Sequence, residues 1–162
     1  MATRSTKKKP KKVKELKRSE LERRCDRIYS CVVRYGNCKN GKIRCITCGR
    51  LIPVAKSHNC HYIGRACRPL RWDLRNMHPG CAHCNVYLAG NLSRYTLYMQ
   101  NRYGDATVRE LIKIEDDWKA GKIKPFKMDE MKKIYSDGLR LLRPIEEKNK
   151  KRLVPESWVP ID

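Results

Sequence analysis

The sequence predicts a small α+β protein in which short strands and two cysteine pairs form a core between flanking α-helices. Its 162 residues suit a single domain. Apolar residues recur at helical spacing on both sides of the region 43–104. Within that region, two Cys-x2-Cys pairs, Cys45/Cys48 and Cys81/Cys84, supply the four thiolates that a tetrahedral structural zinc requires. We therefore expect a zinc-stabilised, treble-clef-like core with a helix starting at the second pair.

The N-terminal part of the chain divides into a basic arm and one helix. Residues 1–18 are rich in lysine, including Lys11 and Lys12, and like charges at this density predict a disordered arm that contacts phosphates. A helix over 19–35 follows, within a segment 19–42 that ends in turns, and Ser19 with Glu22 resembles a capping box at its start. Five apolar residues recur there at spacings of four and three: Leu21, Cys25, Ile28, Val32 and Tyr35.

The middle of the chain alternates short strands with loops. We expect strands at 42–44, 51–54 and 61–63, and a basic loop over 65–73. After the second cysteine pair, helical spacing predicts a helix over 85–103 that Gly104 stops.

The segment 105–162 reads as a helical extension. Asp105 is a plausible N-cap for a helix through Trp118 that ends near Gly121. A last helix is expected over 127–149, kinked or ended by Pro144, with an extended tail after Leu153.

The charge of the chain indicates a polyanionic partner. Lys and Arg number 38 against 17 Asp and Glu, a formal net charge of +21. Nucleic acid fits this charge, whereas no long apolar run supports a membrane. The polar N-terminus shows no signal peptide, so the nine cysteines are interpreted as reduced, in a cytoplasmic protein. Cysteines without paired spacing are expected as buried thiols: Cys25, Cys31, Cys38 and Cys67.

A second site is indicated between the cysteine pairs. His61 lies on a predicted strand, His58 precedes it by three residues, and Asn85 opens the helix that must pack on this strand. A divalent ion can polarise a phosphodiester while a neutral imidazole deprotonates the attacking water. A structural histidine is the alternative, and it is the interpretation preferred for His78 and His83.

These motifs resemble the HNH, or ββα-metal, nucleases. The stretches that carry the likeness are Cys60-His61-Tyr62, the run 76–85 (NMHPGCAHCN), and Leu88-Ala89-Gly90-Asn91 followed by Tyr95. More narrowly, they resemble the phage NinG/Rap recombination endonucleases, a group associated with cleavage of branched DNA. The resemblance covers roughly residues 43–104. It implies a phage-encoded DNA endonuclease acting on branched or Holliday-junction DNA in the cytoplasm of a bacterial host.

The resemblance also assigns roles to particular residues. It makes His61 the general base, Asn76 the residue that braces the hairpin, and Asn85 a ligand of a catalytic magnesium or manganese ion, as in the similar phage endonuclease VII. HNH enzymes commonly carry Asp or His directly before the base, where this chain has Cys60, and a soft thiolate suits magnesium poorly. The second ligand must then be another residue, in order of preference His58, Asn59 or Asn91.

Four arginines crowd the loop beside this site: Arg65, Arg68, Arg71 and Arg75. They are interpreted as phosphate clamps rather than as a solvated face. Tyr62 and Trp72 suit either core packing or stacking on an unpaired base, and a two-fold homodimer would match a symmetric junction. Two alternatives remain: a non-catalytic zinc module that binds DNA or RNA, and a ribosome- or RNA-associated zinc protein.

Overall fold

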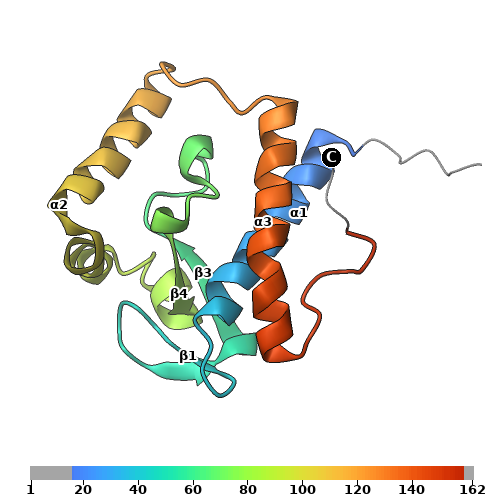
Figure 1. Ribbon diagram of the computed structural model, residues 1–162. Helices are drawn as coiled ribbons and strands as arrows, with labels where there is room; N and C mark the ends of the chain where they lie inside the picture. Colours follow the sequence, from blue (N-terminus) through green and yellow to red (C-terminus); the bar gives the residue numbers. More distant parts are fainter. Residues whose placement is uncertain (1–15, 159–162) are drawn as a thin grey trace, which may run out of the picture.

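Three long helices surround two small antiparallel strand pairs (Figure 1), so the fold is α+β as expected. The computed structural model describes residues 16–158; Lys11, Lys12 and the rest of the expected arm up to residue 15 lie outside them. The helices are α1 (Arg18–Gly36), α2 (Leu92–Lys119) and α3 (Met128–Asn149). Strand β1 (Lys42–Arg44) pairs with β2 (Leu51–Pro53), and β3 (Ser57–His61) pairs with β4 (Met77–Cys81). In the described part of the chain, no helix has the length and apolar content needed to cross a membrane.

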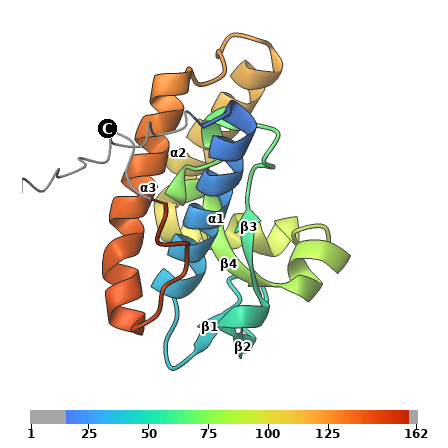
Figure 2. The ribbon, with the colours of Figure 1, turned by 90° about the vertical axis from the view of Figure 1, so that its right-hand side faces the viewer.

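Helices α1 and α3 lie side by side and form the first core (Figures 1 and 2). The helices can approach closely because α3 carries Gly138, where an added Cβ would lie 2.7 Å from Tyr29 Cε2 and 2.9 Å from Ile28 Cγ2. Leu153 and Val154, from the tail after α3, are buried in this core. Helix α3 continues through Pro144 to Asn149, so the proline does not end it.

The helix predicted over 19–35 is confirmed, but its predicted capping box is wrong. The N-cap is Lys17, which makes no side-chain cap hydrogen bond. Glu22 instead accepts hydrogen bonds from Arg18 and from Arg68, so it ties the helix to the loop after β3. Tertiary ion pairing therefore outweighs the local capping pattern here.

The second core lies between α2 and the segment that follows β3. Its buried members are Cys60, Ile63, Cys67, Leu70, Tyr95, Met99, Val108 and Leu111. Gly104, at φ 81° and ψ 162°, interrupts α2 and turns its second half, which confirms the predicted break. The positive φ is a conformation that glycine adopts without the steric penalty of a Cβ. The bend brings both halves of α2 onto the same cluster.

The β3–β4 hairpin positions the second site and differs from the sequence prediction. The strand expected at 61–63 occupies Ser57–His61, and His61 pairs with Met77 at its end. Strand β4 was not predicted because its sequence, MHPGC, contains proline and glycine and lacks polar alternation; all five of its residues are buried. Gly80 is required there, because a Cβ at this position would overlap Cys60 Sγ.

The helix predicted over 85–103 is only partly correct. The chain after β4 forms one π-helical turn, η4 (His83–Tyr87), and α2 starts later, at Leu92. Between them, Ala89, Gly90 and Asn91 all have left-handed backbone, with φ of 46°, 91° and 51°. A helix does start at the second cysteine pair, as expected, but it is a single π-helical turn followed by a compact turn, so the predicted length is wrong.

Candidate active site and metal centre

The four paired cysteines converge on one point. Their sulfur atoms all lie within 4.8 Å of one another, and Cys48 Sγ is 3.9 Å from Cys81 Sγ. A tetrahedral zinc with Zn–S bonds of about 2.3 Å places its sulfurs roughly 3.8 Å apart, so the cluster fits the ion. The backbone N–H of Cys84 also donates to Cys81 Sγ at 3.4 Å, as thiolate ligands require. The cluster can hold a metal such as zinc.

The other five cysteines are free thiols, and all of them are buried. This confirms the expectation for Cys25, Cys31, Cys38 and Cys67. Cys60 lies close to the cluster, because its sulfur and that of Cys45 both flank Gly80. The cluster that could hold a metal nevertheless comprises Cys45, Cys48, Cys81 and Cys84 and does not include Cys60.

His61 stands at the end of β3 and is held by the loop that follows. Its Nε2 lies 3.0 Å from the carbonyl oxygen of Arg71. A carbonyl only accepts, so Nε2 carries the proton and Nδ1 of the neutral ring keeps its lone pair. Burial lowers the pKa of His61 below its ordinary value, against the hydrogen bond to Arg71, which raises it. The neutral ring is thus favoured, which a general base requires.

Asn76 is fully buried and connects the two ends of the loop between β3 and β4. Its Oδ1 accepts from the N–H of Ile63 at 2.7 Å, and its Nδ2 donates to the carbonyls of Ile63 and Leu70, both at 2.9 Å. All three contacts follow His61 within ten residues. The asparagine therefore fixes the backbone that emerges from the strand carrying His61.

His58 and Asn85 meet in space. Asn85 Nδ2 lies 3.1 Å from His58 Nδ1, which joins β3 to η4. Two ligands bound at about 2.1 Å and at right angles to each other around one ion are about 3.0 Å apart. A rotation of the Asn85 amide would present its oxygen in place of its nitrogen. With the amide in that orientation, the two side chains could hold one divalent ion.

The alternative ligands Asn59 and Asn91 lie in different places. Asn59 lines the same groove as His58, and its Oδ1 is buried with no hydrogen-bond partner among the described residues. Asn91 Nδ2 instead lies 3.7 Å from Cys84 Sγ, against the cysteine cluster. The structure thus brings His58, Asn59, His61 and Asn85 together and leaves Asn91 apart from them.

An open groove of about 710 Å³ contains these residues and is closed on one side by α1. Helix α1 contributes Asp26, Arg27 and Arg34, which sequence reasoning missed. Arg34 is held by Ser57 Oγ and the Val54 carbonyl, each at 3.1 Å. Arginines seven residues apart lie on one face of a helix, and that spacing was the signal available in the sequence.

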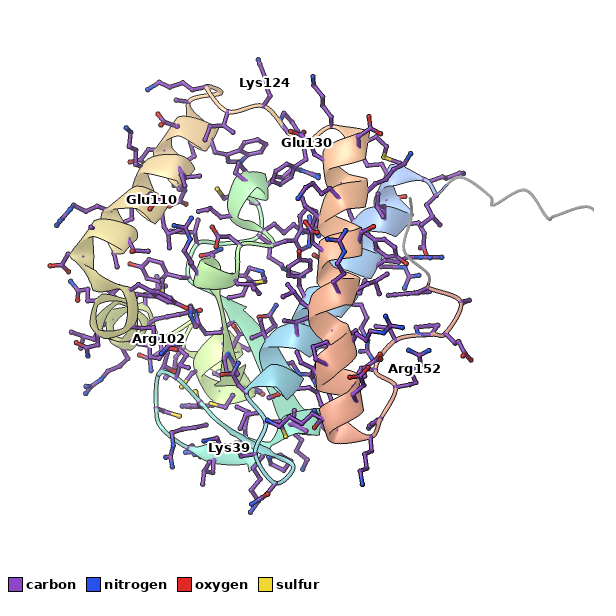
Figure 3. The ribbon with its side chains drawn as sticks, viewed as in Figure 1. Lys39, Arg102, Glu110, Lys124, Glu130 and Arg152 are labelled. Atoms are coloured by element: carbon purple, nitrogen blue, oxygen red, sulfur yellow. The ribbon has the colours of Figure 1, made fainter. Side chains whose placement is uncertain are left out.

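Three of the four loop arginines are engaged within the chain. Arg71 forms a bidentate ion pair with Asp26, in which Nε lies 3.0 Å from Oδ1 and Nη2 lies 2.6 Å from Oδ2. Arg68 pairs with Glu22. Arg75 pairs with Asp73 and with Glu110 on α2, labelled in Figure 3. Arg65 is exposed, lines the groove and forms no ion pair with the described residues.

The remaining aromatic and histidine candidates are mostly internal. Trp72 is buried, and its indole N–H donates to Asp26 at 3.0 Å. Tyr62 packs edge-on against Tyr95 with ring centroids 5.3 Å apart. His78 is enclosed by tyrosines, and burial lowers its pKa to about 4, so it is a neutral structural residue.

Comparison with known proteins finds phage relatives. A family model described as "Bacteriophage Lambda NinG protein" matches residues 2–147. Protein ninG of Salmonella phage P22 is 37% identical over 100 residues, which are 61% of this chain and 47% of that protein. Protein ninG of Escherichia phage 933W is 41% identical over 68 residues, and that of Escherichia phage lambda is 38% identical over 68 residues.

The matched part covers less than half of each of these three relatives, 47% of the P22 protein and 33% of the other two. Both of the 68-residue matches correspond to 41% of this chain. No solved structure matches the chain.

Proposed function

This chain belongs to the NinG family of phage lambda-like proteins, and from that premise we propose that it is a metal-dependent, HNH-type DNA endonuclease acting on branched DNA. The observation that carries the proposal is the state of His61. A half-buried imidazole, for which the neutral form is favoured, lines an open groove; its Nε2–H donates to a backbone carbonyl, which leaves the Nδ1 lone pair available.

His61 would accept the proton of the attacking water at Nδ1. The water oxygen then bonds to phosphorus as the bond from phosphorus to the 3′ oxygen breaks. The Arg71 carbonyl would stabilise the imidazolium that forms, because it accepts a hydrogen bond from Nε2–H in both charge states of the ring. Asn76 keeps the loop that carries this carbonyl in register with the strand.

Asn85 and His58 would hold the catalytic magnesium or manganese, with Asn59 as the alternative ligand. The 3.1 Å contact between His58 and Asn85 and the unpaired oxygen of Asn59 support this assignment. When bound, such an ion supplies charge stabilisation for the phosphate and the leaving oxygen. The four cysteines, with zinc, would fix η4 against the hairpin so that the ligand pair exists before DNA arrives.

The groove itself favours a nucleic-acid backbone. Arg27 and Arg65 are exposed at the groove, and Arg34 lines its wall, while Arg71 is neutralised by Asp26. We expect Arg27, Arg34 and Arg65, which form no ion pair with the described residues, rather than Arg68 and Arg75, to contact phosphates next to the scissile bond. The net charge of +21 would draw DNA to the surface as a whole.

The alternative, a zinc module that binds DNA or RNA without cutting it, explains the charge and the cysteines equally well. It is favoured by one observation, the cysteine at the position before His61 where HNH enzymes carry a hard ligand. The two functions differ only in whether His61 and a divalent ion support turnover.

The test is cleavage of a labelled four-way junction and of a linear duplex with the same arm sequences. Zinc-loaded protein is assayed with magnesium, with manganese, or with neither, and compared with His61→Ala and with His83→Ala, a matched change at an exposed histidine outside the groove. We expect junction cutting that needs the divalent ion, persists in His83→Ala and is lost in His61→Ala while DNA binding and zinc content stay. Binding without cutting in every metal would reject the nuclease and leave the zinc module.

A further inference from the structure

Tyr87 is exposed in a way that no other aromatic residue of the described chain is. The twelve aromatic residues of the sequence all fall within 16–158, and eleven of them are buried or half-buried. Tyr87 is 79% exposed, and its neighbours Val86 and Leu88 are 58% and 46% exposed. Three consecutive apolar side chains in solvent are unfavourable unless they serve a contact.

The segment that presents these side chains is held by backbone hydrogen bonds. We call residues 83–91 the knuckle lobe; in Figure 2 it projects from the body beside β3 and β4. Its chain folds back on the cysteine pair, with Gly90 N–H donating to the Cys84 carbonyl at 2.9 Å and Leu88 N–H to the His83 carbonyl at 3.0 Å. Ala89 and Asn91 close the turn with left-handed backbone, a conformation that costs free energy in residues other than glycine. Because the side chains at the tip are exposed, their burial within the chain does not offset this cost.

The knuckle lobe is continuous with the candidate active site. It contains Asn85, which lines the groove and contacts His58, and Tyr87 follows only two residues later. A DNA strand with a phosphate at Asn85 would therefore pass beside the helical turn that carries the apolar tip. The aromatic residues that the sequence offered for base stacking, Tyr62 and Trp72, are engaged inside the protein.

We propose that the Val86-Tyr87-Leu88 tip is a wedge that stacks on the unpaired bases of branched DNA and so selects branch points over continuous duplex. This proposal deepens the proposed nuclease function and rests on it for the placement of DNA at the groove. Base–aromatic stacking tolerates any base sequence, because every base has a π-face, so the wedge reads structure rather than sequence. Insertion of apolar side chains between bases is easiest where the bases are already unstacked.

A second copy of the chain is a less suitable occupant. The three tip side chains expose roughly 300 Å², whereas a stable protein interface buries about 800 Å² on each partner. A single base face, by contrast, needs little more than the Tyr87 ring. The strongly positive chain also attracts DNA and repels its own copies.

The test measures binding separately from cutting. In the His61→Ala background, with magnesium present, equilibrium dissociation constants are measured for a three-way junction with two unpaired 2-aminopurines at the branch and for a duplex of equal length. The variants are Tyr87→Ala, Tyr87→Phe and Leu97→Ala, the last a matched change at another exposed apolar residue, on α2. Zinc content and sedimentation are recorded for each protein.

We expect Tyr87→Ala to lower the preference for the junction about tenfold, with duplex affinity unchanged and the 2-aminopurine quenching lost. Tyr87→Phe and Leu97→Ala should keep both. An unchanged preference in Tyr87→Ala, or an equal loss on junction and duplex, would overturn the wedge, as would a dimer that Tyr87→Ala converts to monomer. Tyr87-dependent junction binding without any cleavage by the unmodified protein would reject the nuclease and retain the wedge.

Discussion

Replacing Asn76 with alanine would remove the side chain that ties the exit of β3 to the start of β4. Its three hydrogen bonds, at 2.7, 2.9 and 2.9 Å, reach the N–H and carbonyl of Ile63 and the carbonyl of Leu70. The side chain is fully buried, so water does not replace it readily. We expect this substitution to destabilise the protein more than any other single change in the loop.

The size of the loss in the free energy of unfolding depends on which backbone groups Asn76→Ala leaves without a hydrogen-bond partner. The Leu70 carbonyl still accepts from Asp73 N–H at 3.3 Å, so it loses little. The two Ile63 groups have no other partner among the described residues. Each buried, unsatisfied backbone group costs about 1–3 kcal/mol, so the two groups together give a loss of about 2–6 kcal/mol in the free energy of unfolding. The smaller alanine side chain adds a cavity term in the same direction.

Urea unfolding of the zinc-loaded protein, followed by tryptophan fluorescence, would measure this loss. Arg75→Ala is the matched control on the neighbouring residue, because its ion pairs with Asp73 and Glu110 are partly exposed and are expected to contribute below about 1 kcal/mol. Equal, small losses in Asn76→Ala and Arg75→Ala would refute the view that Asn76 braces the loop. A large loss only in Asn76→Ala would support it, whether or not the protein cuts DNA.

Three further predictions concern the metal centre and the base. One zinc per chain should be measured by elemental analysis, and Cys84→Ser should lower zinc occupancy and the midpoint of thermal unfolding, because metal binding stabilises the folded state. If His61 is the base, the cleavage rate should fall as the pH drops through a pKa below the ordinary 6.5, because burial lowers that pKa and the neutral ring is the active form; a midpoint above 6.5 would contradict this. Asp26→Asn should shift that midpoint to lower pH, because Asp26 raises the pKa of His61, and should reduce the plateau rate about tenfold by releasing Arg71. Glu20→Gln, an acid on the same helix that pairs with Arg23 and does not line the groove, is the control for Asp26 and should change neither quantity.

The sequence predicted those parts of the fold that local periodicity determines. The helical spacing of Leu21, Cys25 and Ile28 located α1 within one residue, and Gly104 was correctly placed at the break in α2. Strand β4 was not recognised because its burial comes from tertiary contacts, Met77 with the α1–α3 core and His78 with tyrosines of α2, and not from an alternating pattern. The knuckle lobe was taken for helix because its left-handed residues include Ala89 and Asn91, where the sequence gives weaker signals than glycine would.

The candidate site was predictable where short motifs carry it and not where tertiary contacts do. The paired spacing of the four cysteines was enough to predict that their sulfur atoms converge on one point. His61 and Asn85 were identified from their positions relative to the cysteine pairs, the resemblance added Asn76, and the roles of all three stay predictions. The prediction that the loop arginines bind phosphates stays a prediction, but the ion pairs of Arg68 with Glu22 and of Arg71 with Asp26 were not foreseen, because these acids lie about 45 residues earlier in the sequence. No local pattern encodes a pairing of that kind.

The contribution of α1 explains why the site depends on more than the motif region 43–104. The orientation of His61 depends on the Arg71 carbonyl, which lies 3.0 Å from its Nε2. The Arg71 side chain is in turn held by Asp26, which also accepts a hydrogen bond from the Trp72 indole N–H. Helix α1 thus fixes two successive residues of the loop whose carbonyl sets the tautomer of the base. The cysteine cluster fixes the other side of the groove through η4 and Asn85. Because two independent supports meet at β3, a fragment limited to 43–104 should retain zinc but lose the orientation of His61.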